Sequence, residues 1–359
     1  MTDAPRRIGP VALAICMAVL LALCALLSLN VGSSDLLDFD QVVRGSLASF
    51  GLTDPLEARG LQTIAELRLY RVLVSIGVGA ALALSGGLLQ GVFRNHLASP
   101  SVLGVTSGAS LGASIAILFV ASGGSYMMID RVGGAGPAVI TFGAFAAAMG
   151  VTMIITMIAT TGGRVSVPTL LLVGIALNAM IGGALAAMQA WVLDDSDLTR
   201  ALITWNFGRL DDRSAWHAGV VWIGLAASVT AIPFVAFELD LFASGEEDAR
   251  GLGVDTRRVK LIALAAASLA AAVAVSVCGQ IAFVGLVVPH VLRLLSGPSH
   301  RTLLPLCLLG GPLLVLGTDL AQRLALGANY LPPGVIMSLF GGPFFLYLLM
   351  RNRRSVEAW

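Results

Sequence analysis

The stretch RLYRVLVSIGVGAALALSGGLLQGVF, residues 68–93, decides the fold class of this chain. After Arg71 it carries no charged side chain until Arg94, and about 20 mostly apolar residues suffice for a helix to cross the roughly 30 Å of hydrocarbon in a bilayer. Its glycines, alanines and serines allow the close backbone approach by which helices associate in lipid. The stretch therefore predicts a closely packed transmembrane helix.

The composition of the whole chain points the same way. The 359 residues are 57% hydrophobic and 12% charged, with a mean hydropathy of +0.89, whereas about a quarter of the residues of a soluble protein are charged. A soluble enzyme with a large core is therefore a poor interpretation. The net charge is +1 and the 22 Lys and Arg are scattered, which also excludes a nucleic-acid partner.

Apolar stretches of similar length recur about ten times. They lie near residues 11–30, 64–92, 101–121, 136–160, 166–193, 214–237, 259–278, 281–296, 303–326 and 333–350. The eighth and tenth are short and interrupted by glycine or proline, so nine and eleven spans stay open as alternatives. We expect an all-α integral membrane protein with one transmembrane domain over residues 1–359. The first apolar run exceeds the roughly 7 to 15 residues of a signal peptide, which favours a retained helix.

Charge placement predicts the orientation of these spans. Cytoplasmic loops carry an excess of Lys and Arg, and placing both termini in the cytoplasm puts 13 of the 22 on that side. The polar segment near residues 31–63 is then an outer loop, and the one near residues 238–258 is the long inner loop. The protein is expected to be a multi-pass protein of the bacterial inner membrane, in contact with lipid.

The inner loop has a distinctive pattern. Residues 237–260 read FELDLFASGEEDARGLGVDTRRVK, beginning acidic and ending basic, with Gly245, Gly251 and Gly253 as breaks. This pattern predicts short helices joined by turns. Such a surface can bind a cytoplasmic partner, and a merely solvated connector is the alternative.

Several kinds of chemistry are missing from the sequence. It contains no Gly-rich phosphate loop of the Walker type, so another subunit would have to hydrolyse ATP. The four cysteines lack paired spacing and the four histidines are scattered, so we expect no metal site and no bound cofactor. Asp319 and His290 are the chief ionisable residues inside the spans, where such groups are costly. We interpret both as packing or capping residues rather than proton relays.

Five ordered segments resemble the permease family of iron-siderophore, haem and cobalamin importers. They cover residues 66–113, 170–179 (LLLVGIALNA), 245–258 (GEEDARGLGVDTRR), 279–305 (GQIAFVGLVVPHVLRLLSGPSHRTLLP) and 331–349 (LPPGVIMSLFGGPFFLYLL). The resemblance implies the fold of a type II ABC importer permease. It also implies the partners: a second permease copy or paralogue, two cytoplasmic ATPases that use ATP and Mg²⁺, and a periplasmic substrate-binding protein.

The resemblance also assigns residues to the outer surface. Arg68, Arg71 and Arg323 match positions that meet acidic residues of the binding protein. Guanidinium groups suit this role because they hold carboxylates with two parallel hydrogen bonds. The alternative is that these arginines extend to lipid headgroups.

Other residues are assigned to the inner side and the pathway. The ATPase-coupling residues are expected to be Glu238, Ala249, Gly251, Leu252, Gly253 and Arg257, and the cytoplasmic gate Asn95, Leu97, Ser166 and Val167. An ordinary turn between helices is the alternative for the gate. Asn178 and Gln189 are expected to line the pathway.

The sequence therefore predicts a transport subunit and not an enzyme. The expected function is the permease of an ATP-driven importer for iron chelates, either siderophore or haem. A cobalamin importer permease is the first alternative. An ion-coupled secondary transporter is the second, and the scarcity of carboxylates in the spans argues against it.

Overall fold

The computed structural model describes residues 9–31, 37–122, 135–161, 164–327 and 331–351, and they are mainly helical. The helices are α1 (Pro10–Asn30), α2 (Phe39–Ala48), α3 (Arg59–Phe93), η1 (Pro100–Leu103), α4 (Val105–Ser122), α6 (Ala135–Ile158), α7 (Val167–Trp191), α8 (Ser196–Trp205), α9 (Ala215–Val229), α10 (Ile232–Leu241), η2 (Phe242–Ser244), α11 (Glu246–Gly251), α12 (Thr256–Cys278), α13 (Val284–Ser296), α14 (His300–Leu326) and α15 (Pro333–Arg351). Strands β1 (Thr160–Thr161) and β2 (Arg164–Val165) form one short antiparallel pair.

An apolar helix or helix pair lies in each of the ten predicted stretches. Among the described residues, α1, α3, α6, α7, α12 and α14 are long and apolar enough to cross a membrane by length and composition. The bent pair formed by α9 and α10 brings the number to seven where the pair is counted as one span, and α4, α13 and α15 are shorter apolar helices. The prediction of an all-α membrane protein is confirmed.

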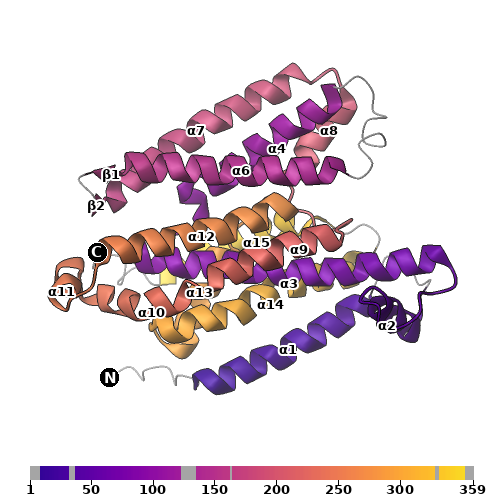
Figure 1. Ribbon diagram of the computed structural model, residues 1–359, viewed down its shortest axis with the longest axis horizontal. Coiled ribbons are helices and arrows are strands. Elements are labelled where there is room, and N and C mark those ends of the chain that lie inside the picture. Colours follow the sequence, from indigo (N-terminus) through magenta and orange to yellow (C-terminus); the bar gives the residue numbers. More distant parts are fainter. Residues whose placement is uncertain (1–8, 32–36, 123–134, 162–163, 328–330, 352–359) are drawn as a thin grey trace.

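The long helices run roughly along one axis of the molecule (Figure 1). One end carries α11 with the β1–β2 pair, and the other carries α2 and α8. We call these the α11 end and the α8 end. The predicted inner loop therefore lies at the α11 end and the predicted outer loop at the α8 end, which leaves the cytoplasmic placement of the termini as a prediction.

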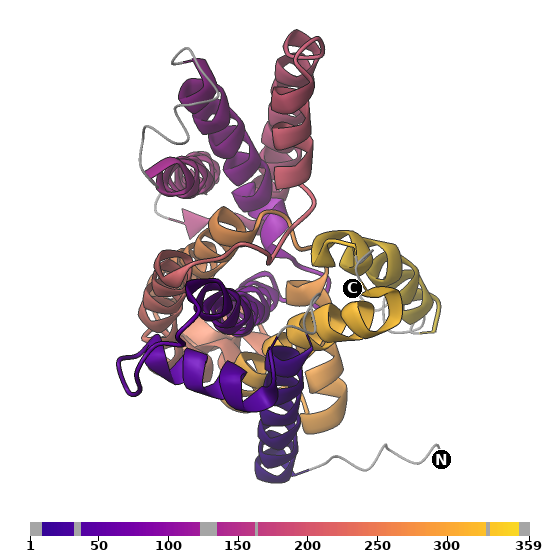
Figure 2. The ribbon, with the colours of Figure 1, turned by 90° about the vertical axis from the view of Figure 1, so that its right-hand side faces the viewer.

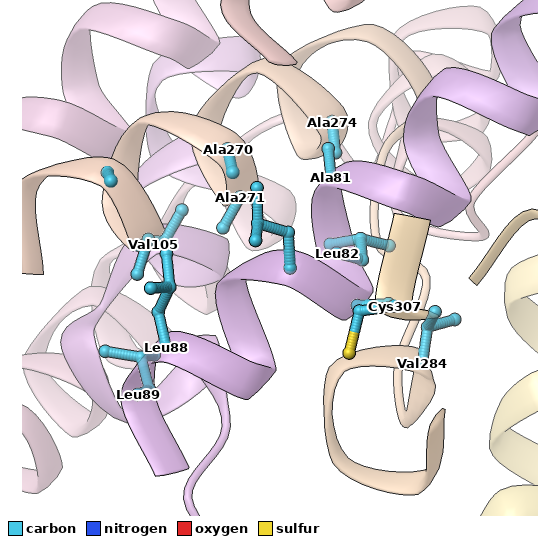
Figure 3. Packing of buried hydrophobic residues seen from close by; sticks show 14 of the residues in the cluster. Ala81, Leu82, Leu88, Leu89, Val105, Ala270, Ala271, Ala274, Val284 and Cys307 are labelled. Atoms are coloured by element: carbon cyan, nitrogen blue, oxygen red, sulfur yellow. The ribbon is translucent and has the colours of Figure 1, made fainter. Parts of the chain in front are cut away.

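Helix α3 is the centre of the bundle. Its side chains are buried along almost the whole apolar stretch, and it packs against α12, α13 and α14. Figure 3 shows Ala81, Leu82, Leu88 and Leu89 of α3 among buried residues of these helices. A Cβ added to Gly86 would lie 1.7 Å from the carbonyl oxygen of Gly285. Glycine is needed at this crossing because the two backbones touch, as small residues allow in lipid.

The periphery is apolar and exposed. Few side chains of α1, α6 and α7 are buried within the chain, and Phe119, Phe142 and Leu172 are more than two-thirds exposed. Figure 2 shows α4, α6 and α7 projecting from one side of the bundle, with α15 on another side. Exposed apolar surface of this extent is incompatible with water as the only solvent.

Two predicted spans are broken in the structure. The stretch 214–237 is two helices, α9 and α10, that meet at a bend of 51°. Pro233 lies in the first turn of α10, where its missing N–H is tolerated but would interrupt a continuous helix. The stretch 101–121 begins as η1 and restarts as α4 after Gly104, which has a φ of +71°.

Candidate functional site

The predicted inner loop, residues 238–258, projects an exposed apolar tip. This inner segment includes α11, and its tip, which we call the α11 tip, consists of Gly251, Leu252 and Gly253. Gly245 and Gly253, with φ values of +132° and +89°, bracket α11 and its last turn. Leu252 is 67% exposed, and added Cβ atoms on Gly251 and Gly253 would meet nothing within 4 Å. A large apolar side chain between two open glycines permits close backbone approach by a partner.

A partly buried ion network holds α11 against the start of α12. The Lys260 ammonium, which is 5% exposed, lies 2.6 Å from Glu246, and the Arg250 guanidinium lies 2.6 Å from the other oxygen of the same carboxylate. Arg250 also donates to the Thr256 hydroxyl at 2.9 Å. Burial raises the pKa of Glu246, but Lys260 and Arg250 outweigh it and leave the pKa below its usual value. The tip is therefore fixed to a membrane-spanning helix.

A second contact joins the inner segment to α14. The Asp240 carboxylate accepts hydrogen bonds from the Ser299 hydroxyl at 2.7 Å and the His300 backbone N–H at 2.5 Å. The His300 ring Nδ1 lies 2.9 Å from the same carboxylate. A carboxylate at a helix N-terminus satisfies backbone donors and complements the helix dipole. Asp240 thus ties the end of α10 to the beginning of α14.

The predicted coupling residues divide into two groups. Gly251, Leu252, Gly253 and Arg257 are exposed, as a contact surface requires. Ala249 is fully buried and Glu238 is half-buried with its Oε2 enclosed and without a partner among the described residues. Ala249 lies under the surface, whereas part of the Glu238 side chain is exposed, and the coupling role of all six residues stays a prediction. Sequence analysis missed Asp240, although it lies only two positions after Glu238.

Two of the three predicted outer arginines are buried in this conformation. Arg68 and Arg323 are 8% and 7% exposed. Arg68 donates to the carbonyl oxygens of Leu29 and Asn30 at 3.3 and 3.0 Å, and Arg323 donates to the Ser28 carbonyl oxygen at 3.2 Å. Both guanidinium groups therefore hold the carbonyl end of α1, whose last residues have no intrahelical donors.

Arg71 is the centre of a charged cluster at the α8 end. It donates to both oxygens of Asp319, at 3.0 and 2.6 Å, and lies 2.6 Å from Asp211. Asp319 is fully buried and also lies 2.9 Å from Arg323, while Asp211 lies 3.4 Å from Arg209. The interpretation of Asp319 as a packing residue agrees with this geometry. Docking of a binding protein on Arg68, Arg71 and Arg323 stays a prediction.

The predicted gate residues form two local turns at the α11 end. The Asn95 Oδ1 accepts a hydrogen bond from the Leu97 backbone N–H at 2.8 Å, which closes the turn after α3. Ser166 caps α7 and accepts from the Thr169 N–H and hydroxyl at 3.4 and 2.8 Å, with Val167 as the first residue of the helix. These contacts are those of ordinary caps and turns, and the gate role stays a prediction.

The predicted pathway residues lie on α7. Asn178 donates to the Ser101 carbonyl oxygen at 3.1 Å and accepts from the Ser107 hydroxyl at 2.5 Å. Its amide therefore fastens α7 to η1 and α4. Gln189 is half-buried near the α8 end of the same helix, and the pathway role of both residues stays a prediction. Within the described ranges, no group of three or more His, Cys, Asp or Glu is placed to hold a metal ion.

Comparisons with known proteins agree with this geometry. The chain is 39% identical to the cobalamin import system permease protein BtuC of Halobacterium salinarum, over 82% of this chain and 74% of that protein. It is 36% identical to the hemin transport system permease protein HmuU of Yersinia pestis, over 81% and 84% of the two chains. It is 38% identical to the vitamin B12 import system permease protein BtuC of Vibrio cholerae, over 82% and 84%.

A solved structure shares the fold. The chain superimposes with a TM-score of 0.77 and 25% identity on an inward-facing structure described as a metal-chelate type ABC transporter, covering 95% of this chain and 99% of that one. The model of the FecCD transport family matches residues 20–351. A multi-pass transport permease accounts for the buried helix α3 and the apolar helices around it, and the chain belongs to the FecCD transport family.

Proposed function

We propose that this chain is the permease subunit of an ATP-driven importer that moves a large metal chelate into the cell. The observation that carries the proposal is the α11 tip, where exposed Leu252 stands on a segment fixed to α12 through Glu246 and Lys260. A solvated connector needs no such fixation. A surface that transmits the movement of a partner must be fixed to the transmembrane helices, because a loosely attached segment would move without displacing them.

The motor is a separate subunit in this proposal. The sequence has no phosphate loop for ATP, so two cytoplasmic ATPases would bind the α11 tips of two permease copies or paralogues and use Mg²⁺ with ATP. A periplasmic substrate-binding protein would deliver the ligand at the α8 end. The α11 end is then cytoplasmic, with both termini on that side of the bacterial inner membrane.

The ligand belongs to the class of haem, ferric siderophores and cobalamin. Iron chelates were the first expectation from the sequence, with cobalamin as the alternative, and the relatives include a hemin permease and two cobalamin permeases. All are large, rigid metal complexes. The permease supplies a path for them, and the binding protein would do most of the selection.

Reconstitution tests the proposal directly. The chain is placed in proteoliposomes with its ATPase and binding protein, and uptake of haemin, a ferric siderophore and cobalamin is measured with and without ATP. We expect uptake of one ligand class that requires ATP. Uptake driven by an ion gradient alone would show a secondary transporter and overturn the proposal.

Sidedness has its own test. A Leu252→Cys variant is labelled with an impermeant thiol reagent in intact cells and in inverted membrane vesicles. We expect labelling only in inverted vesicles, whereas labelling in intact cells would place the α11 tip outside the cytoplasm and exclude coupling to a cytoplasmic ATPase.

A further inference from the structure

A pocket of about 710 Å³ lies at the α8 end between α4, α6, α8 and the segment that precedes α9. Its apolar wall includes Ile117, Val120, Pro137, Ile140, Leu198 and Trp205. Its polar wall is formed by Asp195, Asp197, Arg209, Asp211, Asp212, Arg213 and His217. The volume is in the range of sites that bind small molecules. Apart from the ion pairs of Arg209 and Asp211, the residues of this pocket have no role in the proposed transport function.

His217 presents an unused donor to this pocket. The Ser214 backbone N–H donates to its Nδ1 at 3.2 Å, and a backbone N–H cannot accept a hydrogen bond. The Nδ1 is therefore the acceptor of the neutral ring, which assigns the ring proton to Nε2. His217 is only 4% exposed, and its Nε2 has no hydrogen-bond partner. A buried donor without an acceptor is unfavourable, so a ligand that supplies an acceptor would bind here.

Arg213 adds a cation to the same wall. Its Nε is buried without a hydrogen-bond partner, and within the described part of the chain its guanidinium makes no ion pair. The neighbouring Asp211 is already bound by Arg71 and Arg209. Two adjacent donors, one of them charged, match an anionic oxygen group such as a phosphate.

The rim of the pocket is acidic. Asp197 and Asp212 are exposed, so a ligand with a second negative charge would be repelled, while an ammonium group would be attracted. The complementary headgroup is therefore zwitterionic, with its phosphate at Arg213 and His217 and its ammonium at the rim. This complementarity distinguishes an ethanolamine-type headgroup from a glycerol-type one.

The apolar wall and its position identify the rest of the ligand. The wall is formed by α8 together with the apolar helices α4 and α6, and it includes Trp205, a residue type that is enriched at membrane–water interfaces. We propose that this pocket is a phospholipid site, with Arg213 and His217 binding the phosphate of an ethanolamine phospholipid and the apolar wall holding an acyl chain. The proposal does not rest on the transport function.

Native mass spectrometry of the full chain tests the headgroup assignment. The protein is delipidated and titrated separately with phosphatidylethanolamine, phosphatidylglycerol and diacylglycerol. We expect the apparent affinity to fall in that order, because phosphatidylglycerol lacks the ammonium group and diacylglycerol also lacks the phosphate. Equal or tighter binding of phosphatidylglycerol would overturn the proposal.

A matched pair of variants tests the residues. In Arg213→Gln/His217→Glu, glutamate keeps the capping position of α9 but replaces a donor with a carboxylate. We expect about a tenfold or greater loss of phosphatidylethanolamine affinity, since the charge of Arg213 and the donor of His217 are both lost and a carboxylate then faces the ionised phosphate. Arg200→Gln, an exposed arginine of α8 outside the pocket, should bind as the wild type does. Unchanged affinity in the double variant would refute the assignment.

Photocrosslinking of the unmodified chain decides the question if the double variant fails to fold. A phosphatidylethanolamine with a photoactivatable acyl chain should label peptides from α4 and α6 that contain Ile117 and Ile140. Labelling distributed evenly over the exposed helices would show only bulk lipid and would overturn the site.

Discussion

The buried carboxylate of Asp319 should be a major determinant of stability. Asp319 is fully buried and binds both Arg71 and Arg323. Removing one partner of a buried ion pair usually costs about 3–5 kcal/mol. In Asp319→Asn, Arg71 would keep Asp211 and Arg323 would keep its carbonyl partners at the end of α1, which reduces the loss. We therefore expect the free energy of unfolding to fall by about 3 kcal/mol, the lower end of that range.

Equilibrium unfolding in mixed micelles with increasing dodecyl sulfate measures this difference. The control is Asp40→Asn, which breaks an ion pair with Arg44 whose side chains are 69% and 65% exposed; an exposed pair contributes at most about 1 kcal/mol. A further variant, Asp319→Asn/Arg323→Gln, should recover part of the loss because no unpaired buried charge is left at that position. Free energies of unfolding of Asp319→Asn and Asp40→Asn that differ by less than about 0.5 kcal/mol, the usual range for a surface substitution, would refute this expectation. The charged cluster would then not stabilise the bundle.

Three further predictions concern the inner segment and the helix crossing. Leu252→Asp should abolish stimulation of the ATPase without unfolding the chain, and normal stimulated hydrolysis would remove the coupling role. The pKa of Glu246 is lowered in the folded chain, so its ion pairs stabilise α11 above the usual glutamate pKa and are lost as the pH falls through the folded value. Hydrogen exchange of the α11 backbone amides should therefore become faster at acidic pH in the wild type. In Glu246→Gln it should already be fast at neutral pH. Gly86→Ala should destabilise by about 1–3 kcal/mol or more, as overpacking does, whereas Gly182→Ala on open α7 should have little effect in the same unfolding assay.

The places of the apolar helices could be predicted from the sequence, and the breaks within them could not. Hydropathy reports how apolar a stretch is, so residues 214–237 read as one span. The bend near Pro233 depends on how α10 packs against α12 and α14, which is tertiary information. The Gly-bracketed inner segment was predictable because glycines with positive φ are local features of the chain.

The partners of the outer arginines were beyond sequence analysis. Arg71 and Asp319 are 248 positions apart in the chain, and no local pattern links them. The resemblance placed Arg68 and Arg323 on an outer surface, while the structure has both guanidinium groups at the carbonyl end of α1. Charge balance within the spans could have indicated these partners. Asp319 is a carboxylate within an apolar span, and such a group requires a cation nearby.

Helix α14 connects the two charged regions of the molecule. Its first residues are held by Asp240 at the α11 end, and Asp319 and Arg323 near its other end hold Arg71 and α1. His300 and Asp319 are separated by about 28 Å at a rise of 1.5 Å per residue. A displacement of the α11 tip alone would have to break the contacts of Glu246 with Lys260 and of Asp240 with His300, both of which lie within 3 Å. The lower-cost motion carries α12 and α14 with the tip, so in the proposed mechanism work done at the α11 end would reach the charged cluster at the α8 end through packed helices.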